Sequence, residues 1–206
     1  LPGQSADRMH RVTAATLQEL VWFAEKLSLA SIDTLFVGGG TPSILPDRTR
    51  ALLFSALAAL PRTNDYEWTV EANPESLTPA FLADAEAAGV TRISLGVQSF
   101  HDKLLAVLER GADARRTRAA GERIASVWQG AVSFDLMYGI PGQSPEDLLS
   151  DIETALSFSP DHLSVYSLTV ESGTRFALRV GEEKIRPLSE EREAVLEEVC
   201  AARLTF

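Results

Sequence analysis

The stretch LFVGGGTPSIL, residues 35–45, runs from an apolar segment through three consecutive glycines and a proline. The residues before the glycines predict a strand over 32–37, and Pro46 at a first helical position predicts a helix that continues to Leu60. Glycines let the main chain approach a ligand within hydrogen-bonding distance. The turn has neither the lysine of a nucleoside-triphosphate loop nor the spacing of a dinucleotide turn. From spacing alone, a ligand-binding turn and a purely structural turn both stay open.

The same order of strand and helix repeats along the chain. Further strands are predicted over 66–73, 91–99, 132–138 and 162–168. Helices are predicted between and around them, over 11–29, 78–89, 101–109, 114–128, 144–158 and from Ser189 onward. A regular alternation of strand and helix is typical of a parallel sheet. The sequence therefore predicts an α/β fold.

Polar residues on these strands gather on one face. Side chains alternate between the two faces of a strand, so Trp68 and Val70 lie opposite Glu71. A doubly wound sheet is covered by helices on both faces and is apolar on both, whereas a barrel around a polar ligand has a polar inner face. We therefore expect an incomplete barrel with its site at the carboxyl ends of the strands. The polar residues expected to face inward are Glu71, Asn73, Ser94, Gln98, Asp135, Ser164 and Tyr166.

Two carboxylates, Glu71 and Asp135, lie inside predicted strands. Ionised groups are seldom buried there without a partner. Either they form structural salt bridges, with Arg92 or Arg110 as candidate partners, or they bind the hydroxyls or amine of a ligand. Arg110 ends a predicted helix beside a glycine, so its side chain is able to point back toward the strand ends.

Composition excludes several classes of function. The 206 residues carry a net charge of −10, which argues against a surface for duplex nucleic acid. No apolar run reaches the length of about 18 residues that a membrane span needs, and no signal-peptide core opens the chain, so a cytoplasmic location is expected. The single cysteine, Cys200, excludes a multi-cysteine metal site made by this chain alone. We predict no metal-ligating residue.

Five motifs follow one another at the predicted strand ends: GGGTPS (38–43), VEANPE (70–75), ISLGVQSF (93–100), FDLMYGIPGQ (134–143) and LSVYSL (163–168). In this order they resemble the radical S-adenosylmethionine (SAM) core of the oxygen-independent coproporphyrinogen III oxidase family. The resemblance is strongest to the HemW-like heme chaperone branch. It covers nearly the whole chain from about residue 30 onward.

This resemblance implies a partial (β/α)6 TIM-like barrel of radical SAM type, with its first strand and C-terminal domain missing from the chain. Residues 1–178 would form the incomplete barrel core, and residues 179–206 would begin the C-terminal region. It also implies SAM as cofactor, bound to a [4Fe-4S] cluster, and it leaves the catalytic residues unknown. The implied SAM-binding residues are Gly39, Gly40, Thr41, Glu71, Gln98, Arg110, Asp135 and Thr169.

The chain departs from the family pattern at two motifs, and its ends look cut. The cysteine loop C-x3-C-x2-C is absent, so the cluster ligands are expected outside these residues. The ends, Leu1-Pro2-Gly3 and Leu204-Thr205-Phe206, look cut, and we expect a fragment of a longer protein. Arg110-Gly111-Ala112 also replaces an Arg-x-His sequence of many HemW-like chains.

The function implied by the resemblance is that of a heme chaperone, which carries heme to an acceptor protein that the sequence does not name. One alternative is anaerobic oxidation of coproporphyrinogen III in porphyrin biosynthesis. A second alternative is a barrel enzyme or binding protein that uses no radical, since the cysteine loop is absent.

Overall fold

The computed structural model describes residues 5–204, and the chain ends that look cut, Leu1–Gly3 and Thr205–Phe206, lie outside the described residues. Two compact units make up the chain. The first contains the residues up to Ser94 together with Val127–Val132, and the second contains Leu95–Ser126 together with the residues from Ser133 onward.

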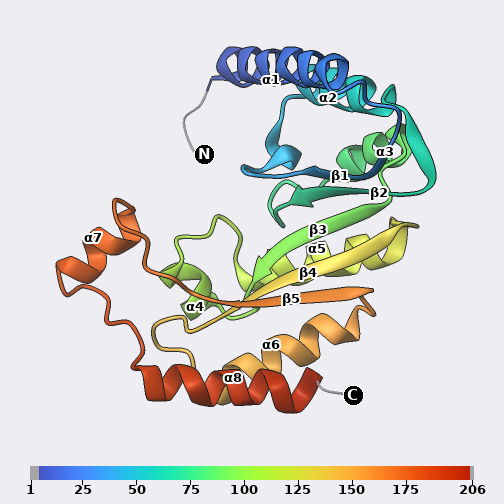
Figure 1. Ribbon diagram of the computed structural model, residues 1–206. Helices are drawn as coiled ribbons and strands as arrows, with labels where there is room; N and C mark the ends of the chain where they lie inside the picture. The colour runs from blue at the N-terminus through green and yellow to red at the C-terminus, as the bar shows by residue number, and fades with distance from the viewer. Residues whose placement is uncertain (1–4, 205–206) are drawn as a thin grey trace. The chain divides into compact units, whose positions relative to one another are not determined.

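Strands and helices alternate along the described residues (Figure 1). The strands are β1 (Ile32–Val37), β2 (Arg62–Ala72), β3 (Arg92–Gln98), β4 (Ala131–Tyr138) and β5 (His162–Ser167). The helices are α1 (Ala6–Lys26), the short 3-10 helix η1 (Pro42–Ile44), α2 (Asp47–Ala58), α3 (Pro79–Ala88), α4 (Asp102–Val107), α5 (Ala114–Val127), α6 (Pro145–Ser157), α7 (Arg175–Gly181) and α8 (Glu190–Leu204).

The five strands follow the order β1-β2-β3-β4-β5 in one sheet. Both β1 with β2 and β4 with β5 pair in parallel. In a doubly wound sheet the strand order reverses at a switch point, whereas the strands of a barrel follow one another in sequence. The observed order therefore excludes the doubly wound arrangement and agrees with the predicted partial barrel.

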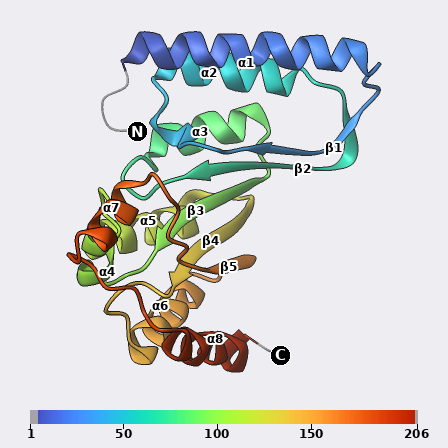
Figure 2. The same cartoon turned by 60° about the vertical axis from the view of Figure 1, so that its left-hand side comes forward.

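In the first unit, helices cover the apolar face of β2. Trp68 and Val70 are fully buried, and Phe54 of α2 meets the Trp68 ring edge-on with 5.9 Å between ring centroids. Helices α1 and α2 lie side by side (Figures 1 and 2). Arg50 of α2 is almost completely buried and donates from Nε to Asp84 of α3 at 2.8 Å, which ties these two helices together.

In the second unit, β4 and β5 carry an apolar face that packs on helices. Phe134 and Leu136 of β4 are fully buried, and Phe158, just after α6, meets Phe134 edge-on at 5.8 Å between centroids. Helix α6 begins with a complete capping box between Ser144 and Asp147. Helix α8 lies beside α6 (Figure 2).

Most predicted elements are confirmed within two residues at each end, but five details are wrong. Helix α1 begins at Ala6 instead of residue 11, because the Ser5 hydroxyl accepts from the backbone N–H of Arg8 and caps a polar first turn. The same helix ends at Lys26 instead of residue 29. Strand β2 begins at Arg62 instead of residue 66, because Arg62 already pairs with Ile32 of β1, ahead of a shift in register. Pro46 caps α2 instead of forming its first residue. Helix α7 was not predicted, because its seven residues are too few to show a helical period clearly.

Within residues 5–204, no helix combines the length and the apolarity that crossing a membrane requires.

We predict that Gly89→Ala destabilises the first unit. Gly89 ends α3 with φ at +88°, and an added Cβ would lie 3.1 Å from the Tyr66 hydroxyl oxygen. A left-handed conformation costs a residue with a Cβ about 1–2 kcal/mol, so urea denaturation should show a loss of that size. Gly181→Ala at the end of α7 is the matched control, because its added Cβ meets open space in the described structure and its φ is not positive. Equal stability of Gly89→Ala and the wild type would contradict the prediction.

Candidate functional site

The glycine turn after β1 places one glycine against a carboxylate. A Cβ at Gly38 would lie 2.7 Å from Cδ of Glu71 and would also collide with the Phe36 ring. With a Cβ at residue 38, the side chains of Glu71 and Phe36 would have to shift from the positions that they occupy. Phe36 itself is 64% exposed on this same face of the sheet.

The next two glycines leave their backbone open. Gly39 has φ at +80°, a conformation that residues with a Cβ seldom adopt. A Cβ added at Gly39 or Gly40 would meet no atom of the described residues within 4 Å. The turn therefore presents bare main chain, which is the arrangement that a bound ligand needs for close approach.

A hydrogen-bond network holds the far side of the turn. The Asn73 side-chain amide donates to Oγ1 of Thr41 at 3.0 Å, and the Asn73 backbone N–H donates to Oγ of Ser43 at 3.2 Å. Ser43 also bonds to Ser76 through their hydroxyls at 2.5 Å. These bonds join the glycine turn to the loop after β2. Asn73 is among the residues expected to face inward, but neither it nor Ser43 or Ser76 is among the predicted binding residues, although all three lie in the loops that follow β1 and β2.

The two arginines considered as partners of Glu71 and Asp135 also contact other groups. Arg92 pairs with Glu67 at 3.4 Å, and Arg110 donates from Nη2 to the carbonyl oxygen of Gly96 at 2.9 Å. Arg110 thus points back to β3, as the sequence suggested. Glu71, Asp135 and Arg110 each have additional interaction partners, so the salt-bridge interpretation of the two carboxylates stays open beside the ligand-binding one.

The second unit contains the other predicted binding residues. Gln98 ends β3, is 7% exposed and accepts at Oε1 from the Tyr166 hydroxyl at 2.7 Å. Asp135 of β4 is half-buried and lies opposite Ser164 in the parallel pairing with β5. Thr169, which follows β5, is exposed. Gly39, Gly40, Thr41 and Glu71 are thus in the first unit, and Gln98, Arg110, Asp135 and Thr169 are in the second.

The second glycine turn, residues 139–143, is fixed by its own glutamine. The backbone N–H of Ile140 donates to the side-chain oxygen of Gln143 at 3.3 Å, and the Gln143 amide donates to the carbonyl oxygen of Met137 at 3.2 Å. Next to this turn, burial, followed by the charge of Glu197, raises the pKa of the Tyr138 hydroxyl. The two hydrogen bonds of Gln143 stabilise the conformation of the turn.

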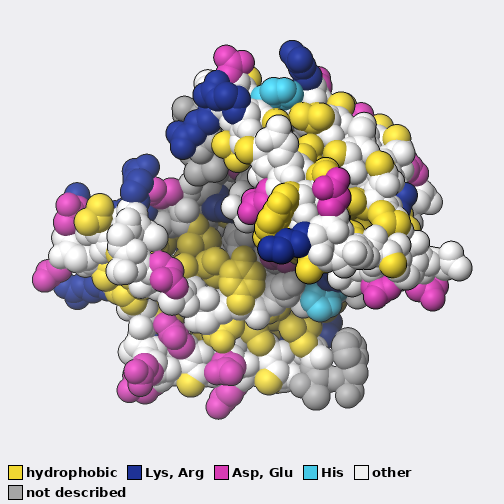
Figure 3. All heavy atoms as spheres, turned by 45° about the horizontal axis from the view of Figure 1, so that its top comes forward, with side chains coloured by type: hydrophobic (Ala, Val, Ile, Leu, Met, Phe, Trp, Pro, Cys, Tyr) yellow, Lys and Arg dark blue, Asp and Glu magenta, His cyan; other side chains and the backbone are white. Residues whose placement is uncertain are grey.

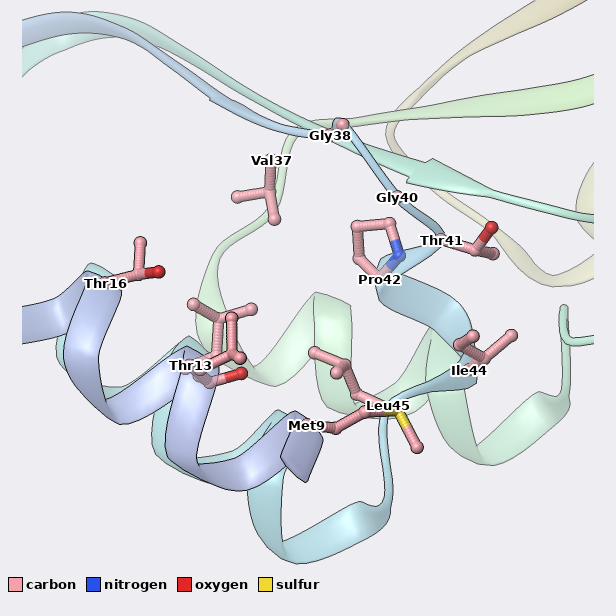
Figure 4. A pocket seen from close by; sticks show the side chains of 13 residues that line it. Met9, Thr13, Thr16, Val37, Gly38, Gly40, Thr41, Pro42, Ile44 and Leu45 are labelled. Carbon is pink, nitrogen blue, oxygen red and sulfur yellow. The ribbon is translucent and has the colours of Figure 1, made fainter. Parts of the chain in front are cut away.

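A cavity of about 290 Å³ lies between α1 and the glycine turn (Figure 4). Its walls are mostly apolar, and Val37 points into it while the Thr41 side chain points away. The glycine turn itself, Gly38–Thr41, also lines this cavity. Glu71 does not line it. The cavity therefore does not contain the carboxylate, and we do not place the ligand there.

Charged side chains of both signs are interspersed over the face of the molecule seen in Figure 3. Arg50 and Arg203, for example, pair with Asp84 and Glu153. Paired charges of this kind leave little uncompensated positive charge at those positions for binding phosphates.

Comparison with known proteins gives three similarities. The chain is 42% identical over 182 residues to "Heme chaperone HemW" of Mycobacterium tuberculosis, covering 87% of this chain and 46% of that protein. It is 40% identical over 149 residues to "Heme chaperone HemW" of Escherichia coli, covering 72% of this chain and 39% of that protein. The solved structure of coproporphyrinogen III oxidase (HemN) from Escherichia coli matches with a TM-score of 0.83 at 24% identity, covering 98% of this chain and 46% of that one.

The structural match confirms the predicted α/β fold of partial-barrel type. The chain spans about half the length, or less, of the two HemW proteins that it resembles. Residues 5–155 match the family described as the Radical SAM superfamily. This chain therefore belongs to the radical SAM superfamily.

Proposed function

We propose that the chain is the SAM-binding part of a HemW-like heme chaperone. The observation that carries the proposal is the bare backbone of the glycine turn beside a carboxylate. Gly39 and Gly40 leave open space within the described structure, and Gly38 admits Glu71 at the end of the neighbouring strand. The similarity to two HemW proteins at 40–42% identity supports the same function.

The residues of the turn fit the amino-acid end of SAM. When bound, SAM supplies an amine, a carboxylate, a positively charged sulfonium, two ribose hydroxyls and an adenine ring. Backbone N–H groups at Gly40 and Thr41 are donors suited to a carboxylate, and the carboxylate of Glu71 suits the amine. A second carboxylate at Asp135, together with Gln98, Arg110 and Thr169, would bind the ribose hydroxyls and the adenine.

The residues present do not fit the [4Fe-4S] cluster of the family. Such a cluster is held by cysteine thiolates, and Cys200 is the single cysteine of the 206 residues. Within residues 5–204, no three His, Cys, Asp or Glu side chains gather as a metal site would require. We derive no step through the cluster and propose that its ligands come from outside these residues.

Heme is the proposed cargo, and a protein that accepts heme is the proposed partner. Both proposals rest on the relatives named as heme chaperones. A cytoplasmic location is proposed with them. We also propose that residues 1–178 belong to the barrel core and that residues 179–206 begin a C-terminal region, because the last strand of the described sheet ends at Ser167.

Gly40→Ala separates a ligand-binding turn from a structural one. An added Cβ meets open space in the described structure and φ is not positive there, so the melting temperature should stay within about 2 °C, which for a chain of this size corresponds to less than about 1 kcal/mol. The methyl group would occupy the space proposed for SAM, and the dissociation constant of SAM should rise at least about tenfold, or 1.4 kcal/mol. Titration calorimetry on the full-length protein measures it. Unchanged affinity would favour the structural turn.

Neutralising either carboxylate is expected to weaken SAM binding. Glu71→Gln and Asp135→Asn keep the side-chain shape but remove the charge. A hydrogen bond to a charged group contributes about 1.5–3 kcal/mol, against about 0.5–1.5 kcal/mol for one between neutral groups. Glu67→Gln is the matched control, because Glu67 lies on the same face of β2 about 13 Å away and pairs with Arg92. Equilibrium dialysis with labelled SAM measures the affinities. If both site variants bind SAM with wild-type affinity, the salt-bridge interpretation of the two carboxylates is correct and the ligand-binding one is wrong.

Heme titration tests the proposed cargo. Protein ligands to the iron change its absorption, so the full-length protein should shift the Soret band at micromolar heme, whereas heme titrated into buffer should not shift. The absence of any Soret shift would contradict the chaperone proposal. Conversion of coproporphyrinogen III to protoporphyrinogen under anaerobic conditions would instead favour the oxidase alternative.

A further inference from the structure

Strand β3 ends in a strained turn at Gln98. Gln98 has φ at +66°, and the backbone N–H of Ser99 donates to the carbonyl oxygen of Val97 at 2.9 Å. A bond between residues two apart, around a central residue with positive φ, describes a γ-turn of the rare, strained kind. Strain of this sort persists only where neighbouring contacts hold it, and it gathers at ligand sites.

The contact that holds this turn comes from Asp151 of α6. Oδ2 of Asp151 accepts from the Ser99 hydroxyl at 2.7 Å, and Oδ1 accepts from the backbone N–H of Phe100 at 2.6 Å. The Ser99 hydroxyl oxygen in turn accepts from the backbone N–H of His101 at 3.1 Å. The three residues that follow Gln98 are thus bound, directly or through Ser99, to one carboxylate.

A carboxylate at position 151 destabilises the fold unless its bonds to this turn compensate for its burial. Asp151 is completely buried, and its helix neighbours Leu148, Ile152 and Ala155 are completely buried apolar residues. A buried carboxylate costs free energy that an apolar side chain there would avoid. Burial raises the pKa of the Asp151 carboxyl, against the opposing effect of the bonds from Phe100 and Ser99.

The side chain of Gln98 is fixed as well. The Tyr166 hydroxyl donates to the amide oxygen of Gln98 at 2.7 Å. Because the amide oxygen of Gln98 faces the Tyr166 hydroxyl, the NH2 group of the same amide points away from that hydroxyl. This NH2 group is a hydrogen-bond donor. A ligand with an acceptor atom, such as a nucleoside, is the chemical class that this donor fits.

We propose that Asp151 is a positioning residue, which holds Ser99 and Phe100 so that Gln98 stays in its γ-turn and presents its amide to SAM. The inference rests on the proposed function, since it assigns the amide donor to SAM. Pre-organisation of a contact residue raises affinity, because less ordering is left to occur on binding. Asp151 acts without touching the ligand.

The experiment compares variants of the full-length protein. Asp151→Asn should raise the dissociation constant of SAM about tenfold, because an amide has one uncharged acceptor oxygen in place of two charged ones. Ser99→Ala should raise it about threefold, because the hydroxyl that joins the turn to Asp151 is removed. Hydrogen exchange at residues 97–101 should become faster in both without SAM present. Ser144→Ala removes the cap of the same helix, so it is the matched control that loses stability while its SAM affinity stays within twofold.

A double-mutant cycle shows whether Asp151 acts through Gln98. In a Gln98→Ala background, Asp151→Asn should cause no further loss of SAM affinity. A full additional loss of SAM affinity in that background would overturn the proposal. Wild-type SAM affinity in both Asp151→Asn and Ser99→Ala would also overturn it. So would a loss of SAM affinity in Ser144→Ala equal to that in Asp151→Asn. If Asp151→Asn does not fold, Ser99→Ala decides by the same criteria. Failure of the wild type to bind SAM would instead refute the proposed function.

Discussion

At the ends of β1 and β2, the carboxylate of Glu71 occupies the space that any side chain at residue 38 would need. The parallel register pairs Val37 with Val70, so the next residues of the two strands come side by side. Glycine at the end of β1 therefore lets the carboxylate keep this position at the end of β2, whereas a side chain at residue 38 would force it to shift. The open backbone of Gly39 and Gly40 then continues from that point, so the candidate site depends on this close approach.

Burial of the opposite strand faces supplies the rigidity behind this arrangement. Trp68 and Val70 of β2, and Phe134 and Leu136 of β4, are fully buried against helices. Their burial fixes the strands, and alternation along each strand then places the polar side chains on the other face. Some of those polar side chains are nevertheless enclosed, since Gln98 is 7% exposed. Enclosed polar groups need partners, which Tyr166 provides for Gln98.

The strands, and the division of their faces, were predictable because alternation with a period of two is local information. The partners of the polar residues were not. Asn73 meets Thr41 across 32 positions of sequence, and Asp151 meets Ser99 across 52 positions. The positive φ of Gln98 was also hidden, because glutamine is not a residue that favours it. The binding residues themselves came from family resemblance, and for this chain they stay a prediction.

The most direct test of the account is a crystal structure of the full-length protein with SAM bound. We expect the amino-acid end of SAM to lie along Gly39, Gly40 and Thr41, with its amine within hydrogen-bonding distance of Glu71. The glycine turn also lines the apolar cavity beside α1, together with Met9 and Val37. SAM bound in that cavity with its amine out of reach of Glu71, or bound away from the turn altogether, would contradict this expectation.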